Sequence, residues 1–330
     1  MKHLTHIIRI IGAAMLLTAC SADENAEPDA LLSDAPVQMV GLTRAASSDA
    51  ALGDIKVILA YGSTTTEGLF QYSDESAWST QLKLKSGSRT YQMYGYMPDD
   101  GLLSSSLSYV SDDEAVLRLQ GLQPITEQDY CILTGIRQTD DAEDKTAATR
   151  GNFSFLYASN RQNYINLFFD HLLSHVEFRM KVGTDYNTVR SIRIKRMKLK
   201  IANASQVAAD ITLTDEVGIS SVGYSVTETD ECLLTIKNEE QNLTTLATAV
   251  GGAYLIPAPS LLGNLLLVTE YDVYDKQGNK IAERTATNKL AEPLNELQRG
   301  EDRTLLITVE PSYLYVLSDA DLDNPPFVVE

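Results

Sequence analysis

The chain has 330 residues, with 45 acidic against 27 basic side chains, and its formal net charge is -18. This acidity argues against a nucleic-acid partner, because nucleic acids are bound chiefly by Lys and Arg that neutralise phosphates. Hydrophobic residues make up 44 % of the chain, which is typical of a protein with a folded core, and the length favours two domains. Four His are present, and since His is the commonest general base and metal ligand, the composition points away from catalysis.

The N-terminal segment has the features of a secretory signal. Basic residues near the start precede an apolar run over residues 7–17, which is too short to span a membrane. The sequence Leu17-Thr18-Ala19-Cys20 follows at once and resembles the lipobox of bacterial lipoproteins. That resemblance implies that residues 1–19 are removed and that the Cys20 thiol carries a diacylglycerol. The alternative is an ordinary signal peptide with an incidental Cys.

A tether and a short strand are predicted next. Residues 21–36 are rich in Ala, Asp, Glu, Ser and Pro without apolar periodicity, which is typical of a tether. Residues 37–43 read as a strand, and Arg44 follows it, before the small and polar residues 45–49. An Arg at the start of such a segment is a good target for a trypsin-like protease, because proteases need an extended, flexible site.

From residue 54 onward, short strands alternate with turns. Alternating, β-branched or aromatic residues predict strands over 55–61, 79–85, 90–96 and 115–119, and the polar residues 138–150 predict a long loop.

A second series of strands follows this loop. Residues 175–182 alternate apolar with polar side chains, as in an antiparallel sheet with one wet face. The alternation over 189–201 slips by one residue near Lys195 and Arg196, which predicts a β-bulge. Further strands are predicted over 265–274 and 303–310, the first of them closed by a turn at 275–279. Two runs of strands predict two antiparallel β-sandwich domains, 45–165 and 166–330, behind a signal peptide at 1–19 and a tether with its strand at 20–44.

Several segments, taken in order, resemble the fimbrillins, the subunits of the type V pili of Gram-negative anaerobes. The similarity spans nearly the whole chain. It lies in Cys20, Leu42–Arg44, Thr90–Pro98, Phe169–Phe178, Tyr254–Pro257 and a final strand after Arg299 and Gly300.

The resemblance implies an all-β fold of two tandem transthyretin-like sandwiches and a function in a cell-surface pilus. Fimbrillins are made as outer-membrane lipoproteins and cut after Arg or Lys by a trypsin-like protease, and the strand so removed is replaced by a donor strand from a neighbouring subunit. Carried over here, Cys20 is the lipid site and Arg44–Ala45 the scissile bond. The excised strand contains Val37, Met39, Val40 and Leu42. The implied partners are other pilus subunits, the processing protease and, before cleavage, the outer membrane.

The C-terminus supplies a candidate donor strand. It is the apolar run Tyr313, Leu314, Tyr315, Val316 and Leu317, and residues 325–329 extend it. The alternative is that this last strand folds onto its own domain.

We expect no metal site, cofactor or catalytic residue. His171 and His175 would share one face of a helix, but on a strand they lie about 13 Å apart at roughly 3.3 Å per residue, too far for one ion. The acidic residues 319–324, with Glu330, imitate a calcium-binding loop without its required Gly and after a strand instead of a helix. Cys131 and Cys232 are compatible with a disulfide or with two free thiols.

The leading hypothesis is therefore a structural and adhesive pilus subunit that is not an enzyme. The second is a surface lipoprotein that keeps its lipid and binds glycan, with Trp78 and the 16 Tyr as stacking platforms. An enzyme has no motif in its favour. The sequence leaves open whether a pilus subunit of this kind forms the stalk, the tip or the anchor.

Overall fold

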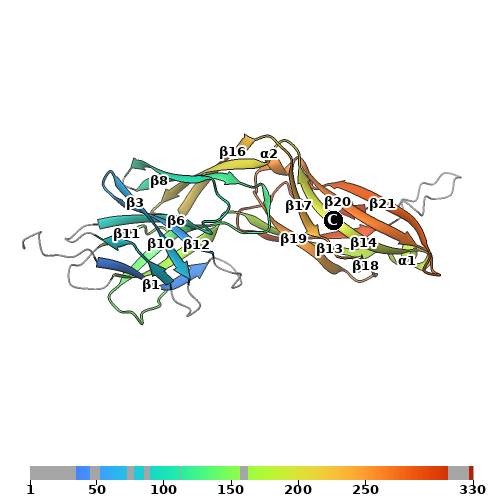
Figure 1. The fold of residues 1–330 in the computed structure, drawn as a ribbon, viewed down its shortest axis with the longest axis horizontal. Coiled ribbons are helices and arrows are strands. Elements are labelled where there is room, and N and C mark those ends of the chain that lie inside the picture. The colour runs from blue at the N-terminus through green and yellow to red at the C-terminus, as the bar shows by residue number, and fades with distance from the viewer. Residues whose placement is uncertain are drawn as a thin grey trace, which may run out of the picture.

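The computed structural model describes residues 35–44, 53–72, 78–84, 90–111, 113–156, 163–310 and 327–329. The molecule is elongated and built almost entirely of strands, which confirms the all-β prediction (Figure 1). The two helices in the described residues are one turn or two long, α1 (Thr184–Val189) and α2 (Pro259–Leu262). Neither is long or apolar enough to cross a membrane.

A nine-stranded sheet forms one end of the molecule. Its strands are, in spatial order, β4 (Trp78–Thr80), β3 (Thr64–Tyr72), β2 (Ile55–Tyr61), β6 (Thr90–Met97), β10 (Cys131–Thr139), β12 (Asn163–His171), β1 (Ala35–Arg44) and β5 (Lys83–Leu84), with β11 (Ser154–Leu156) beside β6.

This sheet curls around a core of its own. The strands at its two ends, β4 and β5, follow one another along the chain, and β1 also contacts β4. Side chains such as Val57, Met93, Leu133 and Leu167 are fully or almost fully buried inside the curl. Alternate residues of β2 and β6 point the opposite way, because successive side chains of a strand face opposite sides of the sheet. Their outer face packs into the larger core of the molecule.

A four-stranded sheet covers that outer face. It has the order β16 (Gly218–Glu228), β15 (Gln206–Thr214), β8 (Glu114–Leu122) and β7 (Ser104–Ser111). Its middle ladder joins β8 to β15, which are far apart in the chain.

Two five-stranded sheets form the other end of the molecule (Figure 1). One has the order β23 (Phe327–Val329), β22 (Asp302–Val309), β13 (Ser174–Val182), β19 (Thr248–Leu255) and β9 (Ile125–Thr126). The other has the order β17 (Cys232–Lys237), β14 (Ser191–Ile201), β20 (Leu265–Tyr274) and β21 (Lys280–Lys289), with β18 (Gln241–Asn242) beside β14.

Most predicted strands fall within two residues of observed ones. The predicted bulge is confirmed, because the ladder between β14 and β20 shifts register between Ile194 and Arg196. The strand predicted over 79–85 is wrong in part: it is two short strands, β4 and β5, broken at Gln81 and Leu82. Leu82 turns inward there and packs over Gly68, which leaves room because it has no side chain.

The predicted division into consecutive sandwiches, 45–165 and 166–330, stays a prediction. Two ladders connect strands from the two sides of residue 165, β8 with β15 and β9 with β19. The larger buried core likewise contains side chains from both sides.

Candidate functional site

The first strand, β1, is held by one long ladder and one short one. Along one edge it runs parallel to β12 from Val37 to Arg44. Along its other edge, Ala35 and Pro36 pair with β5, and the Val37 amide donates to the Leu82 carbonyl over 3.4 Å. Beyond that point, no strand in the described part of the chain pairs with this second edge. A strand bonded mainly on one side needs fewer hydrogen bonds broken to leave the sheet.

Side chains of β1 fill the core of the curled sheet. Val37 is 2 % exposed and Met39 is 7 % exposed, and Leu42 is half-buried against the same cluster. Their neighbours on β12 include Ile165 and Leu167, both fully buried. Removing β1 would therefore expose an apolar groove with a free strand edge.

A bulge keeps the apolar residues of β1 on one face. The register with β12 shifts between Met39 and Gly41, so that Val40 is the extra residue. Without the shift, Gly41 and not Leu42 would continue the inward series. Val40 and Leu42, both predicted in the excised strand, are half-buried.

Asn166 of β12 lies over the same bulge. A methyl group at Gly41 would lie 2.0 Å from Asn166 Oδ1, so no residue with a side chain fits there without movement. Asn166 is buried, its Nδ2 donates to the Asp144 carbonyl over 3.0 Å, and its Oδ1 has no hydrogen-bond partner.

The loop predicted over 138–150 begins only after β10 ends at Thr139, and it packs on the outer side of β10 and β12. Arg150 binds Asp170 through two hydrogen bonds of 2.7 and 2.6 Å, and Asp170 is 3 % exposed. Thr134 also donates to Asp170 over 3.1 Å. Gly135 allows the close approach, because a methyl group there would lie 1.9 Å from the Thr149 carbonyl oxygen. The loop therefore fixes the strand that carries β1.

A second ion pair closes the same loop. Arg137 binds Asp144 over 2.5 Å, and the Thr146 amide donates to Asp144 over 3.0 Å. The hydrogen bond from Arg137, followed by those from Thr146, lowers the pKa of Asp144 well below its usual range.

The predicted processing sites are described in part. Arg44 is the last residue of β1, and its backbone pairs with Phe169. Ala45 and Cys20 lie outside the described residues, as do the candidate donor strand at 313–317 and the acidic segment at 319–324. Of the predicted C-terminal extension, residues 327–329 form β23, which pairs antiparallel with β22.

His171 and His175 do not lie on one strand, which corrects the geometry expected from the sequence. β12 ends at His171 and β13 begins at Ser174. His171 bonds Asp129, whereas His175 Nδ1 lies 2.9 Å from Asp302 Oδ1.

A cluster around His171 was not predicted from the sequence. Asp129, Cys131 and His171 bring a carboxylate oxygen, a thiol sulfur and an imidazole nitrogen within 4.8 Å of one another. Cys131 Sγ and Asp129 Oδ2 both approach the same imidazole atom, Nδ1. A nucleophilic Cys activated by a His–Asp pair needs the two partners at different imidazole nitrogens, so this arrangement cannot relay a proton from the thiol to the carboxylate.

The remaining candidates have structural surroundings. Cys131 and Cys232 are both buried and are not joined by a disulfide. Burial raises the pKa of the Cys232 thiol. Trp78 is half-buried against the inner core, with its ring 5.1 Å from that of Tyr72, which is 48 % exposed.

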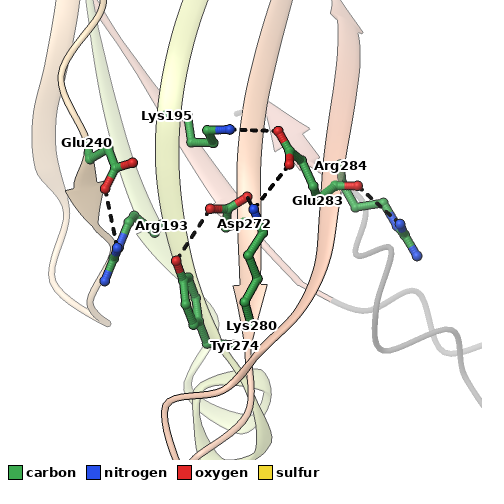
Figure 2. Close-up of polar contacts among 8 residues, drawn as sticks. All are labelled: Arg193, Lys195, Glu240, Asp272, Tyr274, Lys280, Glu283 and Arg284. Atoms are coloured by element: carbon green, nitrogen blue, oxygen red, sulfur yellow. Dashed lines mark hydrogen bonds and ion pairs between the residues drawn. The ribbon is translucent and has the colours of Figure 1, made fainter.

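The five-stranded sheet that contains β17, β14, β20 and β21, called the far sheet below, carries paired charges on its outer face (Figure 2). Lys195 contacts Glu283 over 2.6 Å, and Lys280 contacts Glu283 over 3.1 Å and Asp272 over 2.8 Å. Charge lies along the edge strand β21, whose residues alternate between exposed and half-buried. Charged side chains discourage another strand from adding to an edge, so this edge is a poor acceptor compared with the apolar groove at β1.

Comparison with known proteins identifies the class of protein and then its family. Residues 43–321 match the model of a family described as fimbrillin-like. The chain therefore belongs to the fimbrillin-like family, which consists of structural fimbrial and adhesin proteins of the cell surface whose members assemble with other pilus subunits. No curated protein matches the chain.

Solved structures of low identity resemble the chain. A fimbrial protein from Bacteroides vulgatus is 14 % identical with a TM-score of 0.47, and the match covers 88 % of this chain and 98 % of that one. The fimbrial anchor protein Mfa2 from Porphyromonas gingivalis is 10 % identical with a TM-score of 0.32, and the match covers 89 % of this chain and 95 % of that one. At these values, the family assignment rests on the sequence match alone.

Proposed function

We propose that this protein is a subunit of a cell-surface fimbrium that is exported as a lipoprotein through Cys20, cleaved after Arg44 and joined to its neighbours by donor-strand exchange. The observation that carries the proposal is the position of β1: its apolar side chains fill a core, one of its edges is mostly unpaired among the described residues, and Arg44 is its last residue.

The energetics favour replacement of β1 over a permanently open groove. Burial of a Val or Met side chain contributes roughly 1.5–3 kcal/mol, so the loss of Val37 and Met39 leaves a strong acceptor for another apolar strand. Main-chain hydrogen bonds to β12 give such a strand affinity, and pockets for alternate side chains select its sequence. Neighbouring subunits carrying a suitable strand are the partners that this groove fits.

Arg44→Ala tests the processing step, and Arg44→Lys is the matched control, because a trypsin-like protease accepts Lys. We expect Arg44→Ala to accumulate in cells as a lipid-bearing monomer, whereas wild type and Arg44→Lys form polymers. N-terminal sequencing of the mature protein gives the direct readout, with Ala45 expected first. A wild-type surface protein that still begins at Cys20, together with fimbria, would contradict cleavage. That result would instead favour a subunit that anchors the fimbrium through its lipid, or the glycan-binding alternative.

Two variants test the C-terminal donor separately from β23. Replacing Leu314 and Val316 by Asp changes the candidate donor and keeps residues 327–329 for pairing with β22. Deleting 327–330 does the reverse. We expect the first variant to be cleaved but not to polymerise, and the second to polymerise. Normal polymerisation of the double Asp variant would exclude 313–317 as the donor.

A second candidate function, glycan binding by a protein that keeps its lipid, is favoured by the aromatic pair of Tyr72 and Trp78. The exposed Tyr72 ring tilts against Trp78 at 57°, and such rings stack on sugars. Binding on a glycan array that is lost in Tyr72→Ala and retained in Tyr61→Ala, which alters another exposed Tyr, would support it. No binding by wild type would reject it.

A further inference from the structure

Three chemically different side chains converge where β10 begins and β12 ends. Cys131 and His171 are directly opposite in the antiparallel ladder, so their side chains point to the same face of the sheet. Asp129 precedes Cys131 by two residues, a spacing that returns to that face in extended chain. The ladder therefore places the thiol beside the imidazole, and Asp129, just before β10, brings its carboxylate to the same point.

The carboxylate of Asp129 is incompletely satisfied. Its side chain is 10 % exposed, and Oδ2 bonds His171 Nδ1. The other oxygen, Oδ1, is buried and has no hydrogen-bond partner. A buried acceptor without a partner is costly. A cation bound at Oδ2 would lower that cost, because the negative charge of a carboxylate is shared by its two oxygens.

The spacing of the three groups suits a small tetrahedral cation. Cys131 Sγ lies 3.6 Å from His171 Nδ1 and 3.4 Å from Asp129 Oδ2. Ligands at about 2.3 Å for sulfur and about 2.0 Å for nitrogen or oxygen around a tetrahedral Zn²⁺ are separated by roughly 3.3–3.6 Å. Only Asp129 and His171, now in direct hydrogen-bond contact, need to move apart to admit the ion.

We propose that Asp129, Cys131 and His171 form a binding site for one Zn²⁺, with a water molecule completing the four ligands. The thiolate and the imidazole select zinc over Ca²⁺ or Mg²⁺, which prefer oxygen ligands throughout. Met97, fully buried, is the register partner of Cys131 on its other side, so the thiol lies in soft, apolar surroundings. Arg299 donates to the His171 carbonyl over 2.8 Å and fixes the end of β12.

The ion would join the start of β10 to the end of β12, the strand on which β1 lies. Exchange of β1 leaves the proposed Zn²⁺ site in place, because none of the three site residues belongs to β1. The proposal is therefore independent of fimbrial assembly, and each can fail without the other.

The test uses the full-length chain with its thiols reduced and all metal removed. Titration with Co²⁺ should give the near-ultraviolet absorption of a Co²⁺–thiolate bond, saturating at one ion per chain. Zn²⁺ should displace Co²⁺, bind with the same stoichiometry in calorimetry, and raise the melting temperature. Cys131→Ser should abolish the thiolate absorption. Asp129→Asn and His171→Gln should each weaken Zn²⁺ binding by at least about 100-fold, because second-shell changes alone already cost 10–100-fold.

Matched controls come from the same chain. His175 with Asp302 repeats the His–carboxylate contact without a sulfur, and Cys232 is a buried thiol whose hydrogen-bond partner is the Ile125 carbonyl. His175→Gln and Cys232→Ser should leave Zn²⁺ binding unchanged. Asp129→Asn preserves the shape of the side chain, so circular dichroism should show that this variant is folded, while the titration shows weakened Zn²⁺ binding. The proposal is overturned if wild type binds Co²⁺ without thiolate absorption, if it binds no zinc, or if folded Asp129→Asn binds zinc like wild type.

Discussion

Asn166 of β12 occupies the space that a side chain at Gly41 of β1 would need, with Asn166 Oδ1 only 2.0 Å from the position of a methyl group there. The same Asn bonds the Asp144 carbonyl in the loop behind β12. The first strand, β12 and the loop are therefore in contact through one residue, and a change at Gly41 acts on all three.

Gly41→Ala should loosen β1. The methyl group forces Asn166 or the bulge to shift, and overpacking of this kind costs typically 1–3 kcal/mol. We expect a loss of about 2 kcal/mol in the free energy of unfolding of the uncut chain and faster cleavage by trypsin at Arg44. Gly223→Ala is the control, because the nearest atom there, the Asp210 carbonyl oxygen, is 4.0 Å away. Adding Asn166→Ala to Gly41→Ala should restore part of the loss; full additivity of the two changes would argue against the contact.

Met39→Ala should destabilise the precursor without affecting the cut subunit. The side chain is 7 % exposed inside the curled sheet, and truncation of a buried Met costs roughly 2–5 kcal/mol. Denaturant unfolding of the uncut chain should show that loss, and Val40→Ala, at the half-buried bulge position, should lose less. After cleavage at Arg44 and release of β1, wild type and Met39→Ala should unfold identically. A difference that persists in the cut and purified subunits would mean that β1 stays bound.

Arg150→Met should weaken the protein more than the loss of an exposed ion pair does. Asp170 is 3 % exposed and would retain the hydrogen bond from Thr134 after the change. A buried carboxylate deprived of a charged donor costs about 1.5–3 kcal/mol. The control is Arg118→Met, whose bidentate partner Asp210 is 45 % exposed and which should lose at most about 1 kcal/mol. Equal losses in thermal unfolding of the two variants would contradict the importance of burial at Asp170.

Acid should loosen the loop over β12. The hydrogen bond from Arg137 holds the pKa of Asp144 below its usual range, so the folded state binds this proton less readily than the unfolded state does. The stabilisation is therefore present above the unfolded pKa of about 4 and is lost as the pH falls toward the lower folded value. Glu283, whose pKa is lowered by Lys195 and then Lys280, behaves in the same direction on the far sheet.

Asp144→Asn should remove part of this pH dependence. We expect its melting temperature to fall less than that of wild type between about pH 5 and pH 2. The protection of the amides at 141–149, measured as the hydrogen-exchange rate relative to the intrinsic rate at each pH, should fall with pH in wild type and change less in the variant. Glu239→Gln is the control and should follow wild type, because this exposed residue lies between β17 and β18, at the other end of the molecule (Figure 1). A wild-type pH profile in Asp144→Asn would show that the loop is held by other contacts.

Local pattern predicted the strands well, because alternation reports which face of a strand is buried. The residues of β2, β14 and β20 could be placed in this way, and the slip near Lys195 indicates the bulge without reference to a partner strand. Cleavage at Arg44 and lipidation at Cys20 remain predictions, because neither is a property of the fold.

Partner choice could not be predicted from local pattern. Nothing in the alternation of β8 indicates that it pairs with β15, or that β1 lies parallel to β12. The cluster around His171 was missed for the same reason. The sequence places Asp129 and Cys131 42 and 40 residues before it, and the antiparallel register of β10 and β12 closes that gap.

The ladder between β1 and β12 also sets an order of events for a chain that emerges N-terminus first. Val37 and Met39 have no strand to pair with in this ladder until residues 163–169 have followed them. Within the nine-stranded sheet, β1 comes first along the chain and β12 last, so β1 is among the last strands of this sheet to be enclosed. Contacts so distant in the chain form slowly. A protease that cut at Arg44 before β1 paired with β12 would release a subunit whose groove had never been filled. The timing of cleavage relative to folding therefore decides whether the precursor is ever protected against premature assembly.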